Sequence, residues 1–216
     1  MRKEIFEEGE YYHIYNRGVD KRLIFLNDRE RLRFVNTLYV LNHFLTIPFR
    51  FDILSLEPKE LLTPIPAHVD IVAGCLMPNH YHLMLKPEQK NGVSTFMHKI
   101  GTSYAHYFNT KHERTGRLFE GTFKAKHVDR HEYASYLTHY IHLNPKYLCR
   151  AKLGTKTGEM LKCIADYAWS TLPIYLGKDS PFSPSVSTRF RDNVLDMDAG
   201  EYRILMSDTC REMCRA

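Results

Sequence analysis

Several kinds of segment are missing from this sequence of 216 residues, and each absence removes a class of protein. No apolar run approaches the roughly 18 residues that a membrane-spanning helix needs, so we expect no membrane partner. The first ten residues, MRKEIFEEGE, lack the apolar core and cleavage site of a secretory signal, which predicts a cytoplasmic protein. No GxxxxGK[ST] loop occurs, so no nucleotide cofactor is expected.

Cysteine is scarce and scattered. The chain has five cysteines, and no two of them form a CxxC pair: Cys75, Cys149, Cys163, Cys210 and Cys214. This pattern predicts neither a disulfide framework nor a zinc knuckle, so we expect the cysteines to be reduced. The formal net charge of +5 is compatible with a polyanionic partner but does not establish one.

The spacing of apolar residues predicts the order strand, helix, strand, strand, helix, strand, helix. The predicted strands cover 10–18, 68–77, 80–87 and 114–128, the last as a strand or a bent ribbon, and the predicted helices cover 28–45, 92–112 and 130–144. The second and third strands, joined by Pro78-Asn79, are expected to pair antiparallel. This order indicates an α+β fold with helices packed on an antiparallel sheet, and a ferredoxin-like arrangement is the natural candidate.

We divide the chain into a domain over 1–150 and a C-terminal extension over 151–216, whose role the sequence does not indicate. Within the first domain, residues 46–67 carry four prolines and no clean period, which predicts a loop insertion.

Two histidines stand two apart in the apolar run LMPNHYHLML (76–85). Side chains alternate between the faces of a strand, so His80 and His82 should point the same way, roughly 7 Å apart. That geometry suits two ligands of one metal ion. Histidines also fill half-buried sheet positions with a satisfied hydrogen bond, so the pair alone leaves a structural role open.

The last predicted helix carries a second candidate group. Tyr136, Tyr140 and Asn144 are spaced four apart and therefore share one helix face. The alternative is an aromatic core stripe. An amide in the last turn fits that alternative poorly, because a buried amide needs a polar partner.

Four motifs in this order resemble those of the single-tyrosine HUH transposases, and most closely the REP-associated tyrosine transposases. The motifs are YYHIYNRG (11–18), MPNHYHLML (77–85), GRLFEGTFKAKHV (116–128) and YLTHYIHLNP (136–145). The resemblance covers about residues 10–150. It departs from the family at Tyr81, which stands between the two histidines where a small aliphatic residue is usual and which we expect to pack behind the sheet.

The resemblance implies a DNA strand transferase that cleaves and rejoins single-stranded DNA through a 5′-phosphotyrosine intermediate. Placed by motif, His80, His82 and Asn144 would bind Mg²⁺ or Mn²⁺, and Tyr140 would be the nucleophile. The expected partner is single-stranded DNA with a hairpin, such as a REP palindrome. Relatives work as monomers or as homodimers that exchange tyrosine helices, and both states stay open for this chain.

Basic and aromatic residues alternate between 99 and 130, as in a surface for single-stranded nucleic acid. A solvated face above a core is the alternative. From this region Arg117, Lys124 and Lys126 are candidate DNA ligands. Asn16 and Arg17, at the end of the first strand, are further candidates, although they could equally form a turn.

Two other functions stay open. The chain could be a domesticated, catalytically inactive protein that binds single-stranded DNA. It could also be a metal-dependent phosphodiester hydrolase that uses the histidines with water, in which case Tyr140 would be dispensable.

Overall fold

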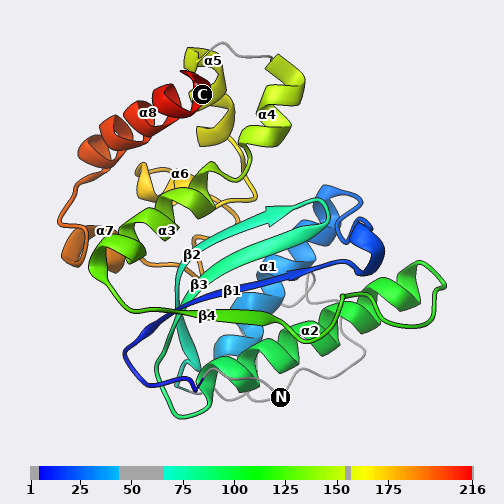
Figure 1. The fold of residues 1–216 in the computed structure, drawn as a ribbon. Helices are drawn as coiled ribbons and strands as arrows, with labels where there is room; N and C mark the ends of the chain where they lie inside the picture. The colour runs from blue at the N-terminus through cyan, green and yellow to red at the C-terminus, as the bar shows by residue number, and fades with distance from the viewer. Residues whose placement is uncertain (1–4, 44–65, 154–156, 216) are drawn as a thin grey trace.

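The structure is a computed structural model that describes residues 5–43, 66–153 and 157–215 (Figure 1). Most of the predicted loop insertion at 46–67 lies outside these ranges. The described chain is built on a four-stranded sheet in the order β2-β3-β1-β4. The strands are β1 (Tyr11–Arg17), β2 (Val69–Met77), β3 (His80–Pro87) and β4 (Lys124–Val128), and every pair of neighbours is antiparallel.

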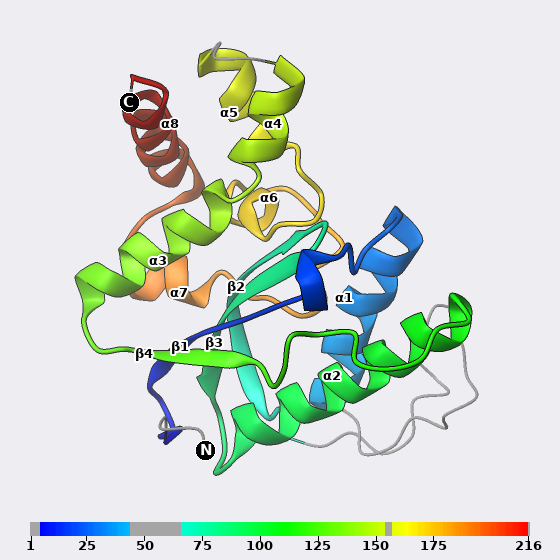
Figure 2. The ribbon, with the colours of Figure 1, turned by 45° about the vertical axis from the view of Figure 1, so that its right-hand side comes forward.

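Helices cover both faces of this sheet. Helices α1 (Asp28–His43) and α2 (Gly92–Lys111) lie side by side on one face, and α3 (His131–Leu143) crosses the other (Figures 1 and 2). This arrangement confirms the predicted α+β fold with helices on an antiparallel sheet. Within 114–128, only Lys124–Val128 forms a strand.

The alternation of side chains along the strands decides which residues face which helices. In β3, Tyr81, Leu83 and Leu85 enter the core beneath α1 and α2, whereas Met84 packs in the cluster beneath α3. His80 and His82 lie four and two residues before Met84 in the same strand, so their side chains point to the same face of the sheet, the face covered by α3. Tyr81 is buried, as the sequence predicts for the residue between the two histidines.

The turn between β2 and β3 is fixed by the segment that follows β1. The Gly18 N–H donates to the Asn79 carbonyl at 2.9 Å, and the Ile24 and Phe25 N–H groups donate to the Pro78 carbonyl at 2.9 and 3.0 Å. Gly18 leads into the short 3-10 helix η1 (Val19–Lys21). A Cβ atom at this position would collide with the Arg22 carbonyl, which accounts for the glycine that ends the first motif.

The chain after α3 packs against both the sheet and α3. It contains α4 (Lys146–Leu153), α5 (Thr157–Ala165), α6 (Leu172–Tyr175), α7 (Arg189–Asn193) and α8 (Ala199–Arg215). The segment before α6 lies along the outer edge of β2, where the Leu76 N–H donates to the Trp169 carbonyl at 2.8 Å and the Thr171 N–H donates to the Gly74 carbonyl at 2.9 Å. These bonds satisfy backbone groups that an edge strand would otherwise leave open.

A buried histidine links α3 to this C-terminal part. His142 has Nδ1 2.8 Å from the Tyr202 hydroxyl of α8 and Nε2 2.8 Å from Thr171 Oγ1. Thr171 Oγ1 also accepts from the Gly74 N–H of β2 at 3.0 Å. Helix α3 is therefore joined to α8 and to the sheet by one network of hydrogen bonds.

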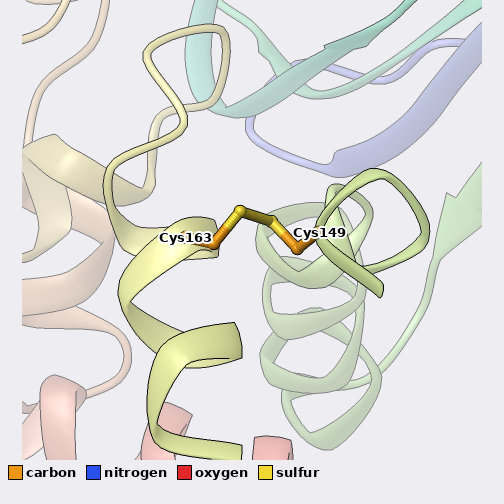
Figure 3. The surroundings of a disulfide bond; sticks show 2 residues. All are labelled: Cys149 and Cys163. Atoms are coloured by element: carbon orange, nitrogen blue, oxygen red, sulfur yellow. A yellow bond between two sulfur atoms is a disulfide. The ribbon is translucent and has the colours of Figure 1, made fainter. Parts of the chain in front are cut away.

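The cysteine prediction is wrong for two of the five residues. Cys149 of α4 and Cys163 of α5 form a disulfide that spans 14 residues of chain (Figure 3). The sequence offers no spacing signal for this pair, because the bond depends on α4 and α5 folding back on each other. Cys75, by contrast, is buried in the sheet as a thiol.

Among the described residues, no helix is long and apolar enough to cross a bilayer.

Replacing Tyr202 with Phe should lower the free energy of unfolding by about 1–3 kcal/mol, because a buried ring nitrogen of His142 loses its partner. Urea denaturation measures the change. Tyr147→Phe is the matched control, since Tyr147 is 66% exposed and should change stability by less than about 0.5 kcal/mol. Equal effects of the two substitutions would contradict the proposed link between α3 and α8.

Candidate active site

Three histidines from two neighbouring strands meet on the α3 face of the sheet. The ring centroids of His80 and His82 are 5.1 Å apart, as are those of His82 and His13 of β1. His13 Nε2 lies 2.9 Å from His82 Nδ1, within hydrogen-bond distance. The pair predicted from the HxH spacing is therefore extended by a third imidazole from the first motif.

Helix α3 brings its tyrosine over these rings. The apolar residues Ala134, Leu137 and Ile141 face the sheet with spacings of three and four, as one buried helix face requires. Tyr140 lies at the border of that face, 42% exposed, with its ring centroid 5.5 Å from that of His82. The phenol therefore contacts both the histidine cluster and solvent.

The amide at the end of α3 reaches the other histidine. Asn144 is the C-terminal cap of α3, is buried, and lies near enough to the side chain of His80 to affect its pKa. Tyr136, one turn before Tyr140, is 63% exposed, so Tyr136, Tyr140 and Asn144 do not form a core stripe. The structure thus brings together His80, His82, Tyr140 and Asn144 within one chain.

Burial keeps the histidines of this cluster neutral. It lowers the pKa of His13 to about 4, with a smaller effect of the nearby Lys126 charge. Burial also lowers the pKa of His82 to about 3, and the neighbouring His13 and His80 act in the same direction. The pKa of His80 is lowered chiefly by burial, although the neighbouring Asn144 side chain opposes that effect. A neutral imidazole is the form that binds metal ions.

The donor set fits a divalent cation only if the asparagine takes part. In the part of the chain that the structure describes, no three histidine, cysteine, aspartate or glutamate side chains are grouped so as to hold a metal ion. Two imidazoles and an amide can do so, because imidazole nitrogen and amide oxygen are both ordinary ligands of divalent metals. His80, His82 and Asn144 are therefore the residues that could hold Mg²⁺ or Mn²⁺.

Three of the candidate DNA ligands lie on the same face as the histidines. Lys124 and Lys126 of β4 pair with Tyr15 and His13 of β1, and Arg17 pairs with His80. All three cations are exposed. Lys124 also lies 3.6 Å from Glu120, an exposed ion pair that contributes little stability and can be exchanged for a phosphate.

Arg117 and Asn16 are placed differently. Arg117 is exposed in the loop before β4, next to Leu118, whose carbonyl accepts from the Val19 N–H. Asn16 is buried, and its amide nitrogen donates to the Gly121 carbonyl while its amide oxygen accepts from the Arg17 N–H. The Asn16 side chain therefore stabilises the backbone at the end of β1. This role agrees with the structural alternative, a turn, that the sequence left open for Asn16.

The aromatic residues between 99 and 130 do not form a base-stacking surface. Four of them are buried in the core beneath α1 and α2: Tyr104, Phe108, Phe119 and Phe123. Several nearby cations are already engaged with protein groups, as Lys111 is with Glu30 at 2.7 Å. For the aromatic residues of this region, the structure therefore supports the second alternative, in which they belong to the core and only the charged residues face solvent.

Two residues of the site were missed by the sequence analysis. His13 is one of the three clustered histidines, and Asn79 has its Oδ1 2.6 Å from His80 Nδ1. Both lie inside the recognised motifs. His13 lies four residues before Arg17 in the first strand, so the two side chains share one face. The sequence could have placed His13 beside His82 only if the pairing of β1 with β3 had been known.

These features place two histidines, a tyrosine and an asparagine together on one face of a four-stranded antiparallel sheet. Residues 61–144 match the model described as "Transposase IS200 like", so the resemblance predicted from the motifs is confirmed. The match includes His80, His82 and Tyr140 and ends at Asn144. Among curated proteins there is no match.

The fold is also found among solved structures. One match is a structure described as a REP-associated tyrosine transposase bound to a REP hairpin. The two proteins align with a TM-score of 0.54 and 13% sequence identity, over 82% of this chain and 85% of the other. At this identity the likeness shows a shared fold, and it extends beyond the family match into the C-terminal part.

The lowered pKa values predict a loss of stability in mild acid. Between pH 6.5 and about 5, histidines become protonated in the unfolded chain while His13 and His82 stay neutral in the folded chain. The unfolded state then binds more protons, so the free energy of unfolding falls as the pH decreases.

In His13→Gln this fall should be shallower by up to about 1.4 kcal/mol per pH unit, because one untitrated buried histidine is removed. Urea denaturation of metal-free protein across this range measures both slopes. Equal slopes for the two proteins would contradict the burial of a neutral His13.

Proposed function

We propose that this protein cleaves and rejoins single-stranded DNA through a covalent bond between Tyr140 and a 5′ phosphate. The observation that carries the proposal is the Tyr140 ring lying 5.5 Å from the His82 ring, with Asn144 beside His80 in the same chain. A nucleophile, two imidazoles and an amide are the groups that such a reaction requires, and the family match over 61–144 supports this assignment.

In the proposed reaction, the Tyr140 phenol oxygen attacks phosphorus, and the bond from phosphorus to the 3′ oxygen breaks. The phenol loses its proton as it attacks, because an ordinary tyrosine with a pKa near 10 is a weak nucleophile when neutral. The departing 3′ oxygen gains a proton and leaves as a hydroxyl. Attack of a 3′ hydroxyl on the phosphotyrosine reverses these changes, so rejoining needs no nucleotide cofactor.

His80, His82 and Asn144 would hold Mg²⁺ or Mn²⁺, which when bound draws charge from a non-bridging phosphate oxygen and orients the scissile bond. All three ligands are uncharged, so the full charge of the cation is available to the phosphate. Tyr140 is 42% exposed, so a DNA strand could approach it from solvent.

The DNA strand is proposed to lie along the histidine face near Arg17, Lys124 and Lys126, with Arg117 contacting DNA further along. Exposed cations beside the nucleophile would position the phosphates. A hairpin-flanked, REP-type site is the first substrate to test, because the solved structure with the same fold holds a REP hairpin. A cytoplasmic location and a monomeric or homodimeric state remain part of the proposal.

Tyr140→Phe should abolish formation of a covalent protein–DNA adduct, because the attacking oxygen is removed. The assay is denaturing gel electrophoresis of end-labelled hairpin DNA after incubation with Mn²⁺. Tyr136→Phe is the matched control, since Tyr136 lies one turn away on the same helix and is exposed, and it should form adduct at the wild-type level.

Other outcomes of this assay separate the alternatives. DNA release by the wild type without an adduct, and unchanged release by Tyr140→Phe, would support the metal-dependent hydrolase. DNA retention without any cleavage would support the inactive binding protein. Adduct formation by Tyr140→Phe would exclude Tyr140 as the nucleophile.

Replacing both Lys124 and Lys126 with Ala should weaken hairpin binding and flatten its dependence on salt. The slope of log affinity against log salt concentration should fall by about 0.7 for each DNA phosphate that the variant no longer neutralises. Fluorescence anisotropy over a salt series measures the slope. Lys90→Ala is the control, because Lys90 is exposed beyond the Pro87 end of β3, away from His80. An unchanged slope in the double variant would show that Lys124 and Lys126 of β4 do not contact DNA.

A further inference from the structure

The two proposed histidine ligands each have a protein partner on the same ring nitrogen. His80 Nδ1 lies 2.6 Å from Asn79 Oδ1, and His82 Nδ1 lies 2.9 Å from His13 Nε2. A neutral imidazole carries one ring hydrogen and can bind a metal only through its other nitrogen. The hydrogen bond at one nitrogen therefore decides which nitrogen is available for the metal.

For His80 the direction of this hydrogen bond is fixed by the orientation of the Asn79 amide. The Asn79 amide nitrogen donates to the Lys21 carbonyl at 3.2 Å, so the amide oxygen is the atom that faces His80. An amide oxygen only accepts hydrogen bonds. His80 Nδ1 must then carry the ring hydrogen, and Nε2 presents its lone pair.

Asn79 is itself held firmly in place. It lies in the turn between β2 and β3, and its backbone carbonyl accepts from the Gly18 N–H at 2.9 Å. The preceding Pro78 carbonyl accepts from two further backbone N–H groups, those of Ile24 and Phe25. The position of the acceptor for His80 therefore follows from the join between this turn and the end of β1.

His13 occupies the corresponding place beside His82. It is buried on β1, one strand away from His82, and the two rings are nearly parallel, with 24° between their planes. One of the two nitrogens must donate and the other accept. If His82 donates from Nδ1, both proposed ligands present Nε2, which is the arrangement that a shared cation requires.

We propose that Asn79 and His13 are positioning residues that hold His80 and His82 in the tautomer with the hydrogen on Nδ1, so that both Nε2 atoms face the metal. This inference rests on the metal site of the proposed function. It adds a specific role for two residues outside the set of His80, His82, Asn144 and Tyr140.

The first measurement is the tautomer of each histidine in the metal-free protein. Long-range ¹H–¹⁵N spectra of ¹⁵N-histidine-labelled protein at pH 8 distinguish the two tautomers, with His80→Ala and His82→Ala used for assignment. Both rings should carry the hydrogen on Nδ1. A hydrogen on Nε2 of either ring in the wild type would overturn the assignment for that ring.

The second measurement compares Asn79→Ala with Asn79→Asp in Mn²⁺ affinity, by titration followed with electron paramagnetic resonance. Both substitutions remove the donation to the Lys21 carbonyl, but only Asp keeps an acceptor for His80 Nδ1. Asn79→Ala should bind Mn²⁺ about 10–100-fold more weakly than the wild type, and Asn79→Asp should stay close to it. Equal affinities of the two variants would show that Asn79 only secures the turn.

His13→Gln and His13→Leu form the corresponding pair for His82, because a glutamine oxygen can replace His13 Nε2 as the acceptor and leucine cannot. Leu should weaken Mn²⁺ binding and Gln should restore it, and the absence of this difference would overturn the role of His13.

These results are independent of the proposed reaction. Ordered tautomers and Mn²⁺ binding in a protein that forms no adduct would refute the reaction and leave the positioning role intact. An adduct-forming protein whose Mn²⁺ affinity is unchanged in Asn79→Ala would refute the positioning role of Asn79 alone, and failure of the wild type to bind Mn²⁺ would refute the positioning proposal as a whole.

Discussion

The packing of α3 against the sheet is the interaction on which the rest of the candidate site depends. Ala134, Leu137 and Ile141 bury one side of the helix against strand residues such as Met84. That packing fixes the rotation of the helix, so Tyr140 falls over the His82 ring and Asn144 reaches His80. A rotation of α3 by one residue, about 100°, would carry the phenol away from the imidazoles.

The C-terminal part of the chain contacts α3 and so contributes to this packing. His142 lies two residues after Tyr140 and is hydrogen-bonded to Tyr202 of α8 and to Thr171, which in turn bonds β2. A second buried cluster continues from Leu143 at the end of α3 into α5, α6 and α8. The C-terminal part thus contacts α3 near the end of the helix, at His142 and Leu143. Described residues of the C-terminal extension, such as Thr171 and Tyr202, therefore pack on the helix that carries Tyr140.

Much of this arrangement follows from local sequence patterns. Strand alternation places His80 and His82 on one face and Tyr81 in the opposite core, and a spacing of four places Tyr140 and Asn144 on one helix face. The contribution of His13 could not be predicted in this way, because it depends on the pairing of β1 with β3. For a related reason, the Cys149–Cys163 disulfide was missed, and the choice between a DNA surface and a buried core for Tyr104 and Phe119 stayed open. Local sequence does not reveal which surface a helix covers or which segments fold back on each other.

The central claim is that a single chain completes its own site, with Tyr140 of α3 attacking DNA beside the histidines of the same chain. Complementation between two defective variants tests it most directly. Tyr140→Phe lacks the proposed nucleophile and His80→Ala lacks a proposed metal ligand, and a size tag on one variant shows which chain carries DNA. After co-expression and mixing with hairpin DNA, the structure predicts no adduct above that of either variant alone. Adduct on the His80→Ala chain, present only in the mixture, would mean that its tyrosine acts at the site of another subunit.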